Sequence, residues 1–72
     1  MREQLLKTAL LQFQAARSKA QANLEIYLNN ATGIGEHPDV VAEIVQLVNA
    51  ITEAEEAEKY LKEKLNENDN RN

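Results

Sequence analysis

The hydrophobic and polar positions divide the chain into two long segments with helical periodicity. Residues 3–30 contain neither Gly nor Pro and are rich in Ala, Leu, Gln, Lys and Glu, which are good helix formers. Their apolar residues recur every three or four positions, which is the spacing of one helix face. That row consists of Leu6, Leu10, Phe13, Ala16, Ala20, Leu24 and Tyr27. The pattern predicts an amphipathic helix over about 3–30.

A second apolar row predicts another helix over about 38–66. Its members are Val40, Ile44, Leu47, Ile51, Ala54, Leu61 and Leu65. Val41, Val45 and Val48 form a neighbouring row, so the first half of this helix is apolar over a wider arc than one partner helix covers. Residues 67–72 are all polar, and we expect them to form a disordered tail.

Residues 31–37 have the composition of a turn between the two helices. Gly33 can adopt the left-handed conformation that ends a helix. Pro38 suits a first helical position, and Asp39 places negative charge at the positive end of the second helix. The sequence therefore predicts an all-α fold, an antiparallel two-helix hairpin forming a single domain over residues 1–66.

One charged residue, Glu58, interrupts the apolar row of the second helix. A hairpin brings Arg17 close to this part of the second helix. We expect an ion pair beside the seam between Arg17 and either Glu55 or Glu58, and Lys7 is an alternative partner for Glu58.

The small size of the chain favours self-association. A chain of 72 residues has a limited core, and small folds usually need disulfides, a metal or a partner chain. The chain has no cysteine for a disulfide and a single histidine. Its two apolar stripes also present more apolar surface than one seam between two helices can cover. We therefore predict a homodimeric four-helix bundle. The expected interface residues are Leu6, Leu10, Phe13, Val41, Ile44, Val45, Val48 and Ile51, and the expected exposed turn carries Ile34, Glu36 and His37.

The polar clusters are better explained by structure than by chemistry. Gly33 and Gly35 lack the third glycine and the lysine of a phosphate-binding loop. Glu36, His37 and Asp39 lie at a hairpin tip, which offers no concave site. The acidic run near Glu55 contains no Glu-x-x-His pair of the kind that binds two metals in helical bundles. We predict no enzymatic activity, no metal and no cofactor.

The net charge of −4 disfavours nucleic acid as a partner, because nucleic-acid binders usually carry a basic stripe. The apolar runs are shorter than the roughly 20 residues that span a bilayer. The first residues do not have the pattern of a signal peptide. We therefore expect a cytoplasmic protein that binds neither membranes nor nucleic acid.

Three stretches carry a family resemblance: Ala22-Asn23-Leu24-Glu25-Ile26-Tyr27-Leu28, Gly33-Ile34-Gly35-Glu36-His37-Pro38-Asp39-Val40 and Glu53-Ala54-Glu55-Glu56-Ala57. In these stretches the chain resembles small uncharacterised proteins encoded by tailed phages of marine bacteria. The resemblance covers about half of the chain. It implies expression in an infected bacterial cytoplasm and assigns no activity to any residue.

Excess apolar surface without a catalytic constellation indicates a non-enzymatic protein–protein interaction module that associates with itself. The alternative, in keeping with the resemblance, is a small phage-type regulator or inhibitor that binds an unidentified host enzyme or transcription component.

Overall fold

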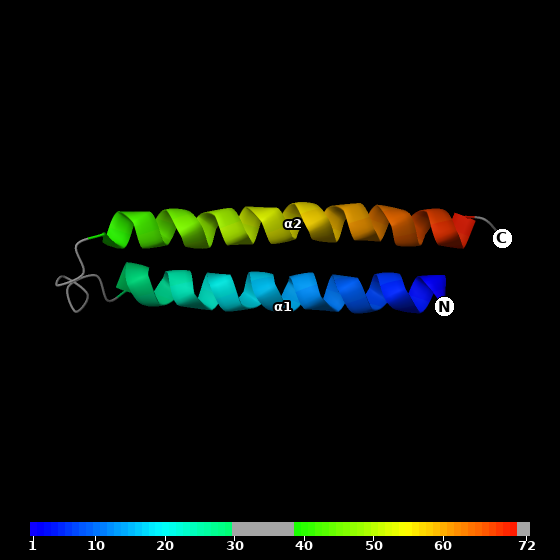
Figure 1. Cartoon of the computed structure of the whole chain (residues 1–72), viewed down its shortest axis with the longest axis horizontal. Coiled ribbons are helices and arrows are strands. Elements are labelled where there is room, and N and C mark those ends of the chain that lie inside the picture. The colour runs from blue at the N-terminus through cyan, green and yellow to red at the C-terminus, as the bar shows by residue number, and fades with distance from the viewer. Residues whose placement is uncertain (30–38, 71–72) are drawn as a thin grey trace.

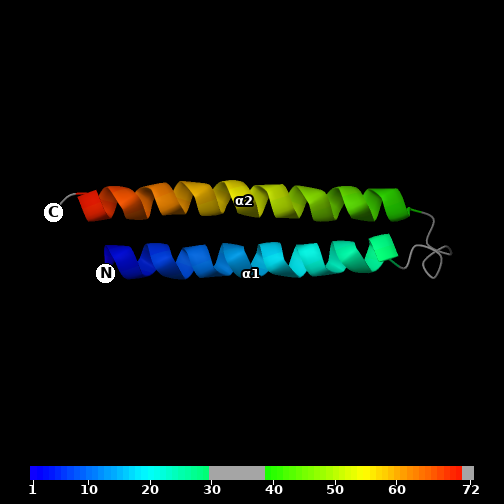
Figure 2. The ribbon, with the colours of Figure 1, turned by 180° about the vertical axis from the view of Figure 1, so that it is seen from behind.

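Two helices packed side by side make up the described part of the molecule. The structure is a computed structural model and describes residues 1–29 and 39–70. Helix α1 (Arg2–Asn29) and helix α2 (Val40–Asn70) run antiparallel, so the start of α1 and the end of α2 lie at the same end (Figure 1). The view from behind shows the same arrangement (Figure 2). The predicted all-α hairpin is confirmed.

The start of α2 differs from the prediction by two residues, because Asp39 caps the helix. The backbone N–H of Ala42 donates to Oδ1 of Asp39 at 3.4 Å, and that of Glu43 donates to the Asp39 carbonyl at 3.2 Å. Aspartate is a preferred N-cap residue because its carboxylate accepts from an otherwise unpaired N–H. The helix therefore begins at Val40. Pro38 and the predicted turn 31–37 lie outside the described residues.

The end of α2 also differs from the prediction. The helix continues to Asn70, so the disordered tail that we expected from residue 67 does not begin there. Side chains spaced along the helix interact near this end: Lys64 Nζ lies 3.4 Å from Glu67 Oε2 and 5.6 Å from the centre of the Tyr60 ring. Such neighbouring pairs each stabilise a helix by roughly a few tenths of a kcal/mol. The predicted tail was based only on the polar composition of residues 67–72.

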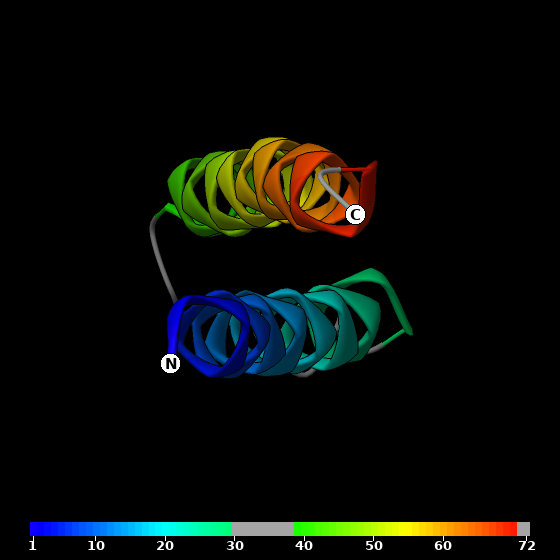
Figure 3. The ribbon, with the colours of Figure 1, turned by 90° about the vertical axis from the view of Figure 1, so that its right-hand side faces the viewer.

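The seam between the helices follows a heptad pattern, in which the spacing alternates between four and three residues. Viewed along their length, the two helices lie one above the other (Figure 3). The seam positions are Leu6, Leu10, Phe13, Arg17, Ala20, Leu24 and Tyr27 in α1, and Val40, Ile44, Leu47, Ile51, Ala54, Glu58, Leu61 and Leu65 in α2. Ala16, which we had placed in the apolar row, is exposed, and the longer side chain of Arg17 occupies that level of the seam.

The core of the hairpin is thin. Among residues 1–29 and 39–67, Ala20, Ala54 and Glu58 are buried, and the large apolar seam residues are half-buried or more exposed. Two helices share one seam, so a large side chain in it keeps one flank open to water. Packing within a single chain therefore leaves much apolar surface uncovered.

Candidate interaction surface

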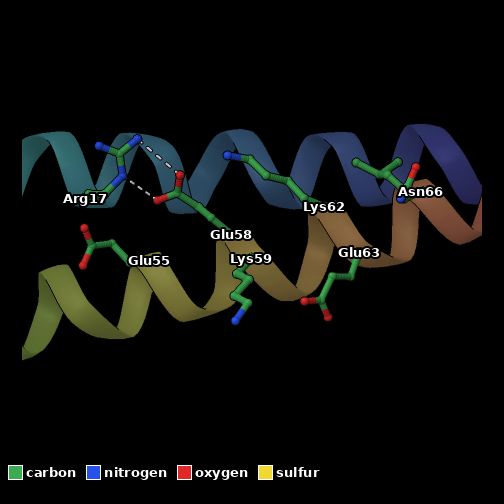
Figure 4. Close-up of a pocket in the computed structure, with 8 residues that line it drawn as sticks. Arg17, Glu55, Glu58, Lys59, Lys62, Glu63 and Asn66 are labelled. Atoms are coloured by element: carbon green, nitrogen blue, oxygen red, sulfur yellow. Dashed lines mark hydrogen bonds and ion pairs between the residues drawn. The ribbon is translucent and has the colours of Figure 1, made fainter.

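An ion pair joins the two helices in the middle of the seam. Nε of Arg17 donates to Oε2 of Glu58 at 2.6 Å, and Nη2 of Arg17 donates to Oε1 at 3.2 Å (Figure 4). Helical side chains tilt toward the N-terminus of their own helix, so in an antiparallel pair these two side chains lean toward each other. Of the two predicted pairs for Arg17, the structure forms the one with Glu58.

The pair lies within the seam and not beside it as we expected. The side chain of Glu58 is 6% exposed and that of Arg17 is 32% exposed. The hydrogen bond and the charge of Glu58 raise the pKa of Arg17 above its already high ordinary value, so the guanidinium stays charged. Nη1 of Arg17 also donates to Oε1 of Gln21 at 3.4 Å. No buried side-chain nitrogen or oxygen among the described residues lacks a hydrogen-bond partner.

An open groove of about 750 Å³ flanks the ion pair. It is lined by Arg17, Glu55, Glu58, Lys59, Lys62, Glu63, Leu65 and Asn66. Six of these eight residues are charged, three of each sign, whereas small-molecule sites are mostly apolar and enclosed. Within residues 1–29 and 39–70, no three His, Cys, Asp or Glu side chains lie close enough together to hold a metal ion. The groove is a solvated polar flank of the seam.

The eight predicted interface residues fall into two groups. Five lie in the seam between α1 and α2: Leu6, Leu10, Phe13, Ile44 and Ile51. Phe13 is at the margin of the seam and is 38% exposed. The other three, Val41, Val45 and Val48, are exposed on α2 outside the seam, and we call them the outer valines. The structure therefore does not bring all eight residues into one surface. The predicted tip residues Ile34, Glu36 and His37 lie outside the described residues.

The outer valines form a continuous exposed patch near the connected end of the hairpin. Val41 is 72% exposed, Val45 is 51% exposed and Val48 is 41% exposed. Their spacing of four and three residues places them on one helix face. Leu28 on α1 is also exposed. It lies seven residues, or about two helical turns, after Gln21, whose side chain accepts a hydrogen bond from Arg17. Leu28 is therefore on the same side of the seam as Arg17 and the groove. We call Leu28, Val41, Val45 and Val48 the loop-end patch.

Sequence reasoning did not assign Leu28 to this patch. Leu28 is 56% exposed, next to Tyr27 of the predicted apolar row. The sequence did hold a signal for its position. Leu28 lies seven residues after Gln21, and residues seven apart lie two turns apart on the same face of a helix. The other strongly exposed apolar side chains of α1 and α2, namely Leu5, Leu11, Ile26 and Tyr60, are spread along the two helices.

Comparison with known proteins adds no relative. No protein-family model matches the chain. Neither the curated proteins nor the solved structures give a significant match. The resemblance to small phage proteins therefore stays a prediction. Over the described residues, neither α1 nor α2 contains a stretch long and apolar enough to span a bilayer.

Proposed function

We propose that the chain is a non-enzymatic protein–protein interaction module that associates with itself through exposed apolar helix faces. The loop-end patch carries this proposal. Three valines in continuous helical spacing remain between 41% and 72% exposed on a hairpin whose own seam buries only two alanines and Glu58 among residues of described burial. Contiguous exposed apolar patches of this kind typically mark interfaces.

The dimensions of the hairpin support association. Its radius of gyration is 16.4 Å, against about 11 Å for a compact domain of the same length. Its accessible surface is 5610 Å², against roughly 4500 Å² for a compact monomer of the same mass. A second hairpin laid against the loop-end patch would cover apolar surface that one chain leaves exposed.

Self-association needs no chemical group that the chain lacks. The sequence contains no cysteine for a disulfide, and the groove beside Arg17 has the composition of a solvated surface. A second copy is the partner that is present wherever the chain is made. In this proposal the dimer presents its remaining charged surface to the solvent or to a further protein.

Light scattering coupled to size exclusion tests the proposal on the full chain. We expect a mass of about twice 8.1 kDa at high concentration and a shift toward one chain mass on dilution. A mass of one chain at every concentration, with helicity retained, would contradict self-association. In that case the loop-end patch would be available to a different protein.

A further inference from the structure

The distribution of charge along the loop-end patch face selects one arrangement of two chains. The three valines of the patch lie on two rows of α2 whose members recur every seven residues. The row that begins with Val41 and Val48 continues with Glu55 and Lys62. The row that begins with Val45 continues with Thr52, Lys59 and Asn66. Four of these residues line the groove beside Arg17 and Glu58 (Figure 4). One face of the hairpin is therefore apolar near the connection and charged toward the other end.

We propose that two copies of the chain pair through the loop-end patch in an antiparallel arrangement that overlaps only near the connected ends. This inference rests on the proposed self-association. A twofold axis passes near Val45, so Val41 lies opposite Val48 of the partner subunit. Each charged half of α2 then extends beyond the end of the partner and stays in water.

A parallel arrangement is disfavoured by charge. Two chains aligned in the same direction would place Glu55, Lys59 and Lys62 each against the same residue of the partner subunit. Like charges placed together across an interface cost several kcal/mol, roughly, and exclude that partner geometry. The two valine rows would gain the same contacts in either case, so the charged rows decide between the two directions.

A fully overlapped antiparallel arrangement is also disfavoured. In that alignment the axis would lie near the middle of α2, and the valines of each chain would face charged residues of the other. Val48 would lie close to Lys62 of the partner subunit, and Glu55 would lie close to Glu55 of the partner subunit, so an apolar side chain would meet a charged one and like charges would meet at the axis. The partial overlap is the arrangement in which apolar surface meets apolar surface.

Single-cysteine variants test the direction, because the natural sequence contains no cysteine. Val41→Cys and Val48→Cys are mixed in equal amounts, equilibrated as dimers and oxidised, and mass spectrometry identifies the disulfide-linked products. We expect the product linking position 41 to position 48 in clear excess over both symmetric products. An excess of the symmetric products, or a statistical mixture, would overturn the proposed arrangement.

Two matched charge variants test the face. Val45→Asp places two carboxylates at the proposed axis and should weaken dimerisation by at least about tenfold. Ile26→Asp is the control, because Ile26 is 56% exposed near the same end and lies about 160° around α1 from Leu28. It should leave the dimer intact. Equal effects of the two variants, or none from Val45→Asp, would place the interface elsewhere.

The shape of the dimer separates this inference from the proposed function. One hairpin is 57 Å long, and a partial overlap makes the dimer markedly longer, whereas full overlap leaves the length near that of one hairpin. Small-angle scattering of the wild-type dimer measures this length. A short dimer would contradict the arrangement and leave self-association standing, whereas a monomeric mass by light scattering would remove both proposals.

Discussion

At the scale of single residues, the Arg17–Glu58 pair is the most specific feature of the seam. Burying a carboxylate is costly, and the bidentate contact at 2.6 Å and 3.2 Å offsets this cost. Apolar residues at both positions would fill the seam without desolvating charge. The pair is therefore better explained as a device that fixes the alignment of the two helices, because a shifted alignment separates the two groups.

Removing one member of the pair should destabilise the hairpin. In Arg17→Met, the buried carboxylate of Glu58 loses both of its seam donors, and we expect the melting temperature to fall by about 5–10 °C. Circular dichroism during heating measures this change.

The double variant Arg17→Met with Glu58→Leu is the matched control. It removes the unpaired charge, so its melting temperature should return to the wild-type value or exceed it. Equal melting temperatures for the single and double variants would show that the two residues are not energetically coupled.

A second residue-scale prediction concerns pH. Lys7 Nζ lies 2.8 Å from Glu3 Oε1 in the first turns of α1. The hydrogen bond from Lys7, followed by the charge of Lys7, lowers the pKa of Glu3 below its ordinary 4.5. Since the folded-state pKa is the lower one, this contact stabilises α1 above pH 4.5 and the contribution is lost as the pH falls through the folded pKa.

An NMR titration of the Glu3 carboxyl carbon measures this shift. We expect a midpoint below 4.5 in the wild type and a return toward 4.5 in Lys7→Met. A Glu3 carboxyl that titrates at the same pH in both proteins would contradict the role of Lys7.

At the scale of the elements, Asp39 determines where α2 begins. Its side chain accepts from the N–H of Ala42, and its own carbonyl accepts from Glu43. In Asp39→Ala we expect a loss of about 0.5–1 kcal/mol in the free energy of unfolding. Urea denaturation followed by circular dichroism measures it. Asp39→Asn keeps the accepting oxygen and should retain most of the stability, so an equal loss in both variants would argue against capping.

Much of this level of organisation could be predicted from the sequence, because helical periodicity is a local signal. The odd charge at Glu58 also predicted an ion pair with Arg17 or Lys7, and the structure forms the one with Arg17. The prediction was wrong at Ala16, because apolar character was taken as the sign of a seam position, whereas the heptad spacing places Arg17 there. Arginine can occupy such a site since its long stem packs against apolar surface while its head group reaches Glu58.

The loop-end patch could be predicted only in part. The wide apolar arc of α2 indicated uncovered valines, and they are exposed. Whether Leu28 joins the patch depends on which face α1 turns toward α2. The observed seam contains Arg17 in place of Ala16, so this face differs from the one predicted from the apolar residues of α1 alone. The two ends of α2 differ from the predicted ends because they depend on local contacts within single turns, namely the cap by Asp39 and the side-chain pairs near Lys64.

At the scale of the whole molecule, we propose that one chain is too thin to be stable alone. The hairpin measures 57 × 15 × 14 Å, and Ala20 and Ala54 are the apolar side chains it buries among residues of described burial. Folding and association should therefore be coupled, with a second copy covering apolar surface that one seam cannot.

The most direct test is thermal unfolding of the wild-type chain across about a thousandfold range of concentration, followed by circular dichroism. For a fold that depends on association, the midpoint rises with concentration, because mass action favours the dimer over unfolded chains. We predict such a rise, together with loss of helicity on dilution. A midpoint that is independent of concentration, with a mass of one chain throughout, would contradict the account.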